Sequence, residues 1–162
     1  MVIVLMGVSG SGKTTVGKIL AADLGWTFIE GDDFHPTENI EKMRGGTPLS
    51  DEDRRPWFQA LQSRVEKACE RNEDVILACS ALKDDYRDFL EQQDPECVHF
   101  VCLTGSEDLI RHRLEQRRGH FIDPALLRSQ LETLESPEGS LKVDITPAPK
   151  AIASEIRRQL NL

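Results

Sequence analysis

The sequence predicts an α/β fold in three layers, in which helices cover both faces of a parallel β-sheet. Two observations predict this class. Short apolar segments alternate with longer amphipathic segments along the whole chain of 162 residues. The apolar segments also lack the in–out alternation of a half-exposed strand, and strands buried on both faces are typical of sheets whose parallel strands are connected by helices.

The apolar segments are the candidate strands. The first is a continuous run of five apolar residues, VIVLM, and the others are short runs of similar character bounded by polar residues or glycine. Runs of this length between turn signals are typical of buried strands. They are Val2–Met6, Trp26–Ile29, Asp74–Cys79, Val98–Leu103 and Leu141–Ile145.

The first two candidate helices follow from apolar residues at helical spacing. Thr14–Leu24 carries such a stripe and stops at Gly25, a residue that commonly ends helices. Ser50–Arg71 has acidic residues in its first turn, which stabilise a helix N-terminus. Its apolar face consists of Phe58, Leu61, Val65 and Ala68. Pro56 is expected to mark the true start of this helix or a kink in it.

The remaining candidate helices alternate with the later strands. They are Lys83–Glu91, Ser106–Gln116, Pro124–Leu134 and Pro149–Leu160. Two polar stretches rich in Gly, Pro, Arg and His interrupt the alternation, Gly31–Leu49 and Arg117–Asp123. Such stretches in a compact domain often carry function, as binding segments or lids. With no repeat or linker between the elements, residues 1–162 are predicted to form a single domain, with a lid at about residues 117–123.

Composition and charge exclude several classes of protein. The net charge of −8 and the scattered basic residues argue against nucleic acid as a partner, because a phosphodiester backbone needs a basic surface. No apolar run approaches the roughly 20 residues that cross a bilayer. The first apolar run lacks a preceding basic segment, so it is interpreted as a strand and not as a secretory signal. We therefore expect no membrane partner and a cytoplasmic location.

The four cysteines are expected to be reduced. They are Cys69, Cys79, Cys97 and Cys102, and their spacing matches neither CxxC nor a metal site. Cys79 and Cys102 lie in apolar strand patterns, where cysteine behaves as a small hydrophobic residue. The prediction is therefore four buried thiols, as is usual for a cytosolic protein.

The segment between the first strand and the first helix matches GxxxxGK[ST] at every position. It consists of Gly7, Val8, Ser9, Gly10, Ser11, Gly12, Lys13 and Thr14. Glycines let the backbone curl so that several N–H groups converge on phosphate oxygens, and the positive end of the following helix adds to the attraction. Lys13 is placed to reach the β- and γ-phosphates, and the hydroxyls of Thr14 and Thr15 can bind Mg²⁺. This motif predicts binding of a nucleotide with Mg²⁺, but does not by itself distinguish a kinase from a switch protein.

Polar residues at the ends of the second and third strands predict an acceptor site. The carboxyl ends of adjacent parallel strands face the same crevice, so Asp32 should lie near the γ-phosphate. A carboxylate there can accept a hydrogen bond from an attacking hydroxyl or hold Mg²⁺ through water, whereas Asp33 is more easily explained as a turn residue. His35 is a candidate for a substrate hydroxyl, with a turn-stabilising role as the alternative.

Basic side chains supply further candidates. Lys83 and Arg87 lie four residues apart on one expected helical face after the small Ser80, and together could clamp an acceptor carboxylate or phosphate. The alternative is a solvated basic face. A second group of arginines, Arg113, Arg117 and Arg118, precedes Gly119-His120-Phe121. Arginines in a lid can close over a nucleotide and neutralise the transferring phosphoryl group.

The motifs together resemble those of the gluconokinases. They run in the family's order as GVSGSGKTT, GDDFHP, PLSDEDRRPW, CSALKDDYRD, RRGHF and SQLETLESP, and are spread over nearly the whole chain. The resemblance implies a shikimate-kinase-like sheet of five strands in the order 2-3-1-4-5. It also implies ATP-dependent phosphorylation of D-gluconate at its 6-hydroxyl, with Mg²⁺ as cofactor.

The resemblance also assigns roles to residues. It makes Asp32, and not Asp33, the acceptor-side carboxylate, and it places Arg113 on adenine with the loop 144–149 on the other face. Gln130 is expected to face the substrate from the helix after the lid. The residues proposed to hold gluconate are Asp32, His35, Arg54, Ser80, Lys83, Arg87, His120 and Gln130, and those proposed for catalysis are Lys13, Asp32 and Arg117.

Two alternatives stay open. The first is another small kinase, acting on shikimate, a nucleotide or adenylylsulfate. The second is a non-catalytic ATP-binding switch protein, although Lys13, Thr14 and Asp32 favour catalysis. The sequence leaves open the oligomeric state, a homodimer included. It also leaves open which of Lys83, Arg87 and Arg54 meets the gluconate carboxylate, and whether Asp32 is a base or an orienting group.

Overall fold

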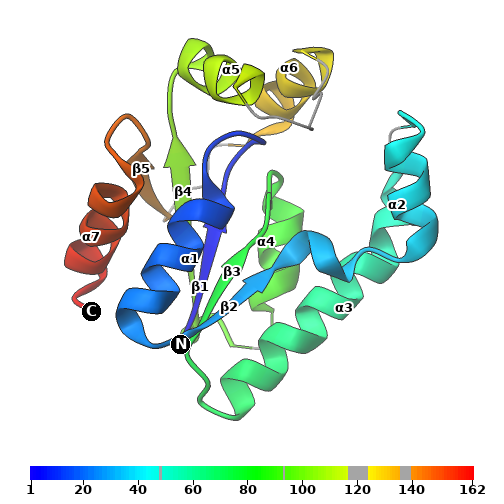
Figure 1. The fold of residues 1–162 in the computed structure, drawn as a ribbon. Helices are drawn as coiled ribbons and strands as arrows, with labels where there is room; N and C mark the ends of the chain where they lie inside the picture. Colours follow the sequence, from blue (N-terminus) through cyan, green and yellow to red (C-terminus); the bar gives the residue numbers. More distant parts are fainter. Residues whose placement is uncertain (48, 93, 117–123, 136–139) are drawn as a thin grey trace.

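A five-stranded parallel β-sheet forms the centre of the protein (Figure 1). The computed structural model describes residues 1–47, 49–92, 94–116, 124–135 and 140–162. The strands are β1 (Val2–Met6), β2 (Thr27–Glu30), β3 (Val75–Ala78), β4 (Val98–Thr104) and β5 (Leu141–Asp144). Their order across the sheet is β2-β3-β1-β4-β5, which confirms the predicted fold class and strand order.

The helices confirm the predicted alternation and add two elements to it. They are α1 (Lys13–Leu24), α2 (Thr37–Arg44), α3 (Asp51–Glu70), α4 (Asp84–Glu91), α5 (Glu107–Glu115), α6 (Pro124–Thr133) and α7 (Pro149–Leu160), with a short 3₁₀ helix, η1 (Gly31–Phe34). The sequence did not predict α2 or η1. Asn39 is the buried residue of α2, so that helix has no apolar stripe to reveal it. In the part of the chain that the structure describes, no helix is long and apolar enough to span a membrane.

Two apolar clusters fill the layers on either side of the sheet. Alternate residues of β1 point to opposite faces, so Ile3 and Leu5 join one cluster while Val4 and Met6 join the other. Helices α1 and α7 pack on the first face, and α3 and α4 pack on the second (Figure 1). Because both faces are covered, all residues of β1 and β3 are buried, and these strands appear as continuous apolar runs in the sequence.

Helix α3 begins where the predicted range Ser50–Arg71 places it. Ser50 is the N-cap residue and forms a reciprocal capping box with Asp53, in which the Ser50 hydroxyl accepts the Asp53 N–H at 3.2 Å and the Asp53 carboxylate accepts the Ser50 N–H at 3.0 Å. Pro56 lies inside the helix, so the first of the two roles predicted for it, the helix start, is wrong, and the second, a kink, stays a prediction. The capping box satisfies the N–H groups of Ser50 and Asp53, and it defines where the helix begins.

The prediction of four reduced thiols is wrong for two of them, because Cys69 and Cys97 form a disulfide. Cys69 lies in the last turn of α3, just before β3, and Cys97 directly precedes β4. Both strands flank β1, so the topology brings together two cysteines that are 28 residues apart in the sequence. A search for short cysteine spacings cannot detect such a pair. Cys79 and Cys102 are free and buried, as predicted, and burial raises the pKa of the Cys79 thiol to about 12.

Reduction of the Cys69–Cys97 disulfide is expected to lower the free energy of unfolding by about 3 kcal/mol, because the bond closes a loop of intermediate length in the unfolded chain. Urea unfolding with and without dithiothreitol measures this difference. The Cys97→Ser variant is the control, and its stability should not respond to the reductant. Equal midpoints for the wild-type protein in both conditions would contradict the bond.

Candidate functional site

The phosphate-binding loop predicted from the sequence joins β1 to α1 at the carboxyl edge of the sheet. Its glycines Gly7, Gly10 and Gly12 all have positive φ, at 134°, 83° and 100°. At Gly10 a Cβ atom would also lie 2.8 Å from the Leu114 side chain of α5. Any other residue at position 10 would have a strained backbone and a Cβ atom that clashes with Leu114, so the path of the loop depends on glycine there.

The charged end of Lys13 lies within this loop. Its Nζ donates to the carbonyl oxygens of Gly7 at 2.9 Å and Val8 at 3.1 Å. The backbone of Gly12 is the N-cap of α1, whose first turn carries Lys13 and Thr14. The positive end of the helix and the lysine ammonium therefore point to the same place, as the binding of a phosphate requires.

A carboxylate that the sequence did not single out faces the loop from β2. Glu30 is the last residue of that strand, and its Oε2 accepts a hydrogen bond from the Thr14 hydroxyl at 2.7 Å. Burial raises the pKa of the Glu30 carboxyl, the Thr14 hydrogen bond lowers it, and the charge of Asp32 raises it further. Thr15, by contrast, is exposed in the first turn of α1. The signal that could have identified Glu30 is its place at a strand end next to Asp32.

Oxygen ligands of this kind suit Mg²⁺. The Thr14 hydroxyl and the carboxylates of Glu30 and Asp32 are hard donors, and Mg²⁺ prefers one or two carboxylates together with substrate phosphates. The hydrogen bond between Thr14 and Glu30 brings the first two together at the mouth of the phosphate loop. These residues therefore fit the metal that the phosphate-loop motif predicts.

Replacement of Glu30 by glutamine is expected to raise the Mg²⁺ concentration needed for half-maximal activity at least about tenfold, because metal-supporting groups typically contribute that much. The amide can still accept the Thr14 hydrogen bond but carries no charge. Activity at a fixed ATP concentration, measured against free Mg²⁺, tests this. Asp33→Asn removes a charge from the same region, and its Mg²⁺ requirement should stay within about twofold of the wild-type value.

Asp32, the predicted acceptor-side carboxylate, lies on η1, directly after β2. Its side chain is exposed, and its carbonyl oxygen accepts the His35 N–H at 3.3 Å. The charge of Asp32 acts on the pKa of Glu30 more strongly than that of Asp33 does. It also affects the pKa values of His35 and Cys79. The Asp32 carboxylate is therefore close enough to Glu30, His35 and Cys79 to influence their pKa values, and its place beside the γ-phosphate stays a prediction.

Trp57 of α3 packs against the segment that carries Asp32, a contact that the sequence did not reveal. Its Nε1 donates to the Gly31 carbonyl at 2.7 Å, and its ring stacks on His35 with centroids 4.3 Å apart. His35 Nδ1 also lies 3.4 Å from the Asn39 amide nitrogen. Burial lowers the pKa of His35, an effect that the charge of Asp32 opposes. The imidazole is therefore held in place beside Asp32, where it can hydrogen-bond a substrate hydroxyl in its neutral form.

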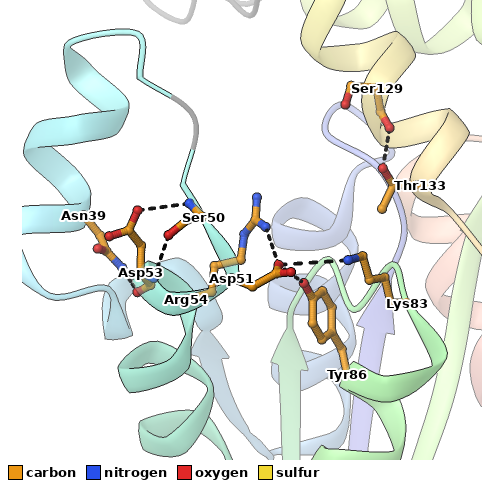
Figure 2. Close-up of polar contacts among 9 residues, drawn as sticks. All are labelled: Asn39, Ser50, Asp51, Asp53, Arg54, Lys83, Tyr86, Ser129 and Thr133. Atoms are coloured by element: carbon orange, nitrogen blue, oxygen red, sulfur yellow. Dashed lines mark hydrogen bonds and ion pairs between the residues drawn. The ribbon is translucent and has the colours of Figure 1, made fainter.

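A cluster of polar side chains links α3 to α4 on the same side of the sheet. Figure 2 shows Arg54 and Lys83 pointing toward Asp51 from opposite sides, with the hydroxyl of Tyr86 beside them. Asp51 Oδ1 accepts a hydrogen bond from Tyr86 at 3.1 Å and from Arg54 at 3.2 Å, and Lys83 Nζ lies 4.0 Å away. The structure thus brings together two of the three basic residues predicted to bind an acceptor carboxylate.

Arg87 is the third of those residues, and its surroundings differ. The expectation that Lys83 and Arg87 share one helical face is wrong, because Lys83 is the N-cap residue of α4 and has an extended backbone. The Arg87 side chain is only 6% exposed. It donates to the Ala81 carbonyl at 2.8 Å, to the Asp84 carboxylate and to the Glu135 carbonyl at 3.4 Å. Arg87 therefore braces the segment after β3, and a direct bond to substrate stays a prediction.

Three further candidates lie around the phosphate loop. Gln130 of α6 accepts the Ser9 N–H at 2.7 Å, so this side chain contacts the loop, and its predicted contact with the substrate stays a prediction. The Ser80 carbonyl accepts the Gly7 N–H at 3.2 Å. Arg113 of α5 donates to the Ile145 carbonyl at 2.6 Å, which joins it to the loop predicted to enclose adenine. Arg117, His120 and the lid at residues 117–123 lie outside the described residues.

Comparison with known proteins identifies the family. A family model described as an AAA domain matches residues 2–137. The thermosensitive gluconokinase of Escherichia coli (strain K12) is 47% identical over 146 residues, which cover 88% of this chain and 78% of that protein.

Solved structures agree with this relationship. A gluconokinase from Sinorhizobium meliloti 1021 superposes with a TM-score of 0.84 at 43% identity, covering 98% of this chain and 94% of that one. A shikimate kinase from Aquifex aeolicus vf5 has a TM-score of 0.66 at 20% identity, covering 99% and 96%, and shares the fold. With identity above 40% over most of both chains in the first two cases, the chain belongs to the gluconokinase family.

Proposed function

We propose that this protein transfers the γ-phosphoryl group of ATP to the 6-hydroxyl of D-gluconate, giving ADP and 6-phospho-D-gluconate. The main support is its 43–47% identity to gluconokinases over most of the chain. The phosphate loop beside Glu30 and Asp32 provides the parts that such a transfer needs. We further propose a cytoplasmic location.

The phosphate loop is proposed to hold ATP. Backbone N–H groups of Gly7–Thr14 surround the β- and γ-phosphates, and Lys13 compensates the negative charge that shifts onto the leaving ADP. Thr14, with Glu30 and Asp32 around it, would hold Mg²⁺, which neutralises phosphate oxygens when bound. Arg113, close to the Ile145 carbonyl, is assigned to the adenine side.

Asp32 is proposed to orient the acceptor hydroxyl and to take its proton. The hydroxyl oxygen forms a bond to the γ-phosphorus while the bond from that phosphorus to the β–γ bridging oxygen breaks, so ADP leaves with the electron pair. The proton passes from the hydroxyl to the Asp32 carboxylate and then to solvent. His35, Ser80 and Gln130 are assigned to the sugar-acid hydroxyls. The predicted lid residues Arg117 and His120 would shield the transferring group.

The cationic residues Arg54 and Lys83 are proposed to bind the carboxylate of gluconate. Both point into the cluster between α3 and α4 (Figure 2) and already contact a carboxylate, that of Asp51. An arginine together with a lysine and a phenolic hydroxyl forms a donor set that suits a carboxylate. This set explains why a sugar acid, and not a neutral sugar, is the proposed acceptor.

A coupled assay of ADP release across several acceptors tests the function. The panel contains D-gluconate, shikimate, nucleoside monophosphates and adenylylsulfate, and ³¹P NMR identifies the phosphorylated position. We expect turnover with gluconate and a 6-phosphate product. Preferred turnover of another acceptor would favour a different small kinase. ATP binding without stimulation by any acceptor would favour a non-catalytic switch protein.

A further inference from the structure

Asp51 occupies the centre of the cationic cluster between α3 and α4. Its Oδ1 accepts hydrogen bonds from the Tyr86 hydroxyl at 3.1 Å and from Arg54 Nη1 at 3.2 Å. Lys83 Nζ forms an ion pair with the same oxygen at 4.0 Å. Lys83 also lies over the Tyr86 ring, 5.4 Å from its centroid. Three donors from two helices thus converge on a single carboxylate oxygen, which belongs to the protein itself.

For the start of α3, Asp51 contributes only its negative charge in the first turn, a contribution shared with Glu52 and Asp53. It is the first residue of α3, but the Ser50–Asp53 capping box already satisfies the start of that helix. The Asp51 side chain is 73% exposed, whereas those of Arg54 and Lys83 are both 36% exposed. Ion pairs this open to solvent contribute little to stability, so the carboxylate can leave its partners at small cost.

Electrostatics keeps Asp51 ionised. The hydrogen bond from Tyr86 lowers the pKa of the Asp51 carboxyl, and the charges of Lys83 and Arg54 lower it further. An ionised Asp51 competes with any other carboxylate for the same donors, and it also repels an incoming anion. A ligand can replace it without leaving the two cations unpaired only if the ligand brings its own anionic group, and gluconate brings a carboxylate.

We propose that Asp51 is an internal competitor for the substrate's carboxylate, and that it sets both the affinity and the selectivity of the acceptor site for sugar acids. This inference rests on the proposed function. In the absence of a sugar acid, Asp51 holds Arg54, Lys83 and Tyr86 in position. On binding, the gluconate carboxylate takes over these donors and the Asp51 side chain turns to solvent.

The Asp51→Asn variant tests the proposal because it keeps the shape and one acceptor oxygen but removes the charge. We expect the KM and the dissociation constant for gluconate to fall about three- to tenfold, with kcat and the KM for ATP within about twofold of wild type. Coupled kinetics and isothermal titration with gluconate provide the two measurements. Glu52→Gln is the matched control, since it removes one charge from the same exposed helical turn, and its KM for gluconate should stay within about twofold of wild type.

A double-mutant cycle with Lys83→Ala makes the test specific. If Asp51 competes for Lys83, most of the gain from Asp51→Asn should disappear in the Lys83→Ala background. A KM for gluconate that is unchanged or raised in Asp51→Asn, or a gain that persists in full without Lys83, would overturn the inference. Turnover of gluconate by the wild-type enzyme distinguishes these outcomes from a failure of the proposed function. If the wild-type enzyme did not phosphorylate gluconate, both the proposed function and this inference would be wrong.

Discussion

Replacement of Lys13 by alanine is expected to lower kcat by at least about a thousandfold. The Lys13 ammonium lies inside the phosphate loop, 2.9 Å from the Gly7 carbonyl oxygen and 3.1 Å from that of Val8. Phosphoryl transfer involves little covalent chemistry by the protein, so rate enhancement comes from positioning and from stabilising the charge that moves toward ADP. No other cation among the described residues is shown bound to these loop carbonyls.

The loss should appear in kcat and not in folding. Coupled ADP release at saturating gluconate measures kcat, and thermal unfolding shows whether the variant keeps its stability. Lys18→Ala is a useful control, because Lys18 is an exposed lysine of the same helix whose ammonium lies over the Phe28 ring, away from the loop. Activity of Lys13→Ala within tenfold of wild type, with Lys18→Ala unchanged, would contradict the role assigned to Lys13.

The fold could be predicted because its strongest signals are local. Buried parallel strands are continuous apolar runs, and helices that cover a sheet carry an apolar stripe, so each element shows its own pattern. The helix α2 has no such stripe, since it lies at the edge of the molecule and buries only Asn39. The range Ser50–Arg71 predicted for α3 is confirmed, but Pro56 was also offered as a later start, because proline is common at helix starts while the Ser50–Asp53 capping box needs specific side-chain geometry.

The site could be predicted where a motif fixes it. The loop around Lys13 and the place of Asp32 at a strand end follow from spacing and topology alone. Glu30 and Trp57 were missed because their roles depend on contacts with distant segments, the Thr14 hydroxyl and the Gly31 carbonyl. Arg87 was instead singled out as a ligand of the substrate, although the structure shows it bound to carbonyl oxygens of the protein. A sequence alone does not distinguish an arginine that faces solvent from one that is buried in this way.

The cysteines illustrate how compartment-based reasoning can fail. Cys69 and Cys97 were predicted to be reduced because their spacing matched no known pattern and the protein was expected in the cytoplasm. Their pairing depends on the positions of β3 and β4 on either side of β1, a property of the sheet as a whole. A contact of this kind is visible only once the strand order is known.

Asp32→Asn is expected to lower kcat about a hundredfold or more, which is the usual contribution of a general base or of a group that orients an attacking hydroxyl. Asparagine matches aspartate in size and can still accept a hydrogen bond, but it cannot take a proton. The dissociation constant for ATP should change by less than about threefold, because the phosphate loop that is proposed to hold ATP is untouched. Kinetics at saturating gluconate and titration with a non-hydrolysable ATP analogue measure the two effects.

Asp33→Asn separates the chemistry from the general loss of a negative charge. Both aspartates are exposed residues of η1, so the two variants change the same charge in the same short helix. Of the two aspartates, Asp32 is the one whose charge is among the main influences on the pKa values of His35 and Cys79, and it raises the pKa of Glu30 more than Asp33 does. A large loss in Asp32→Asn with near-normal Asp33→Asn would place the reacting hydroxyl at Asp32. Full activity of Asp32→Asn would mean that another group activates the acceptor hydroxyl. Equal losses in both variants would mean that η1 supplies only negative potential near the metal.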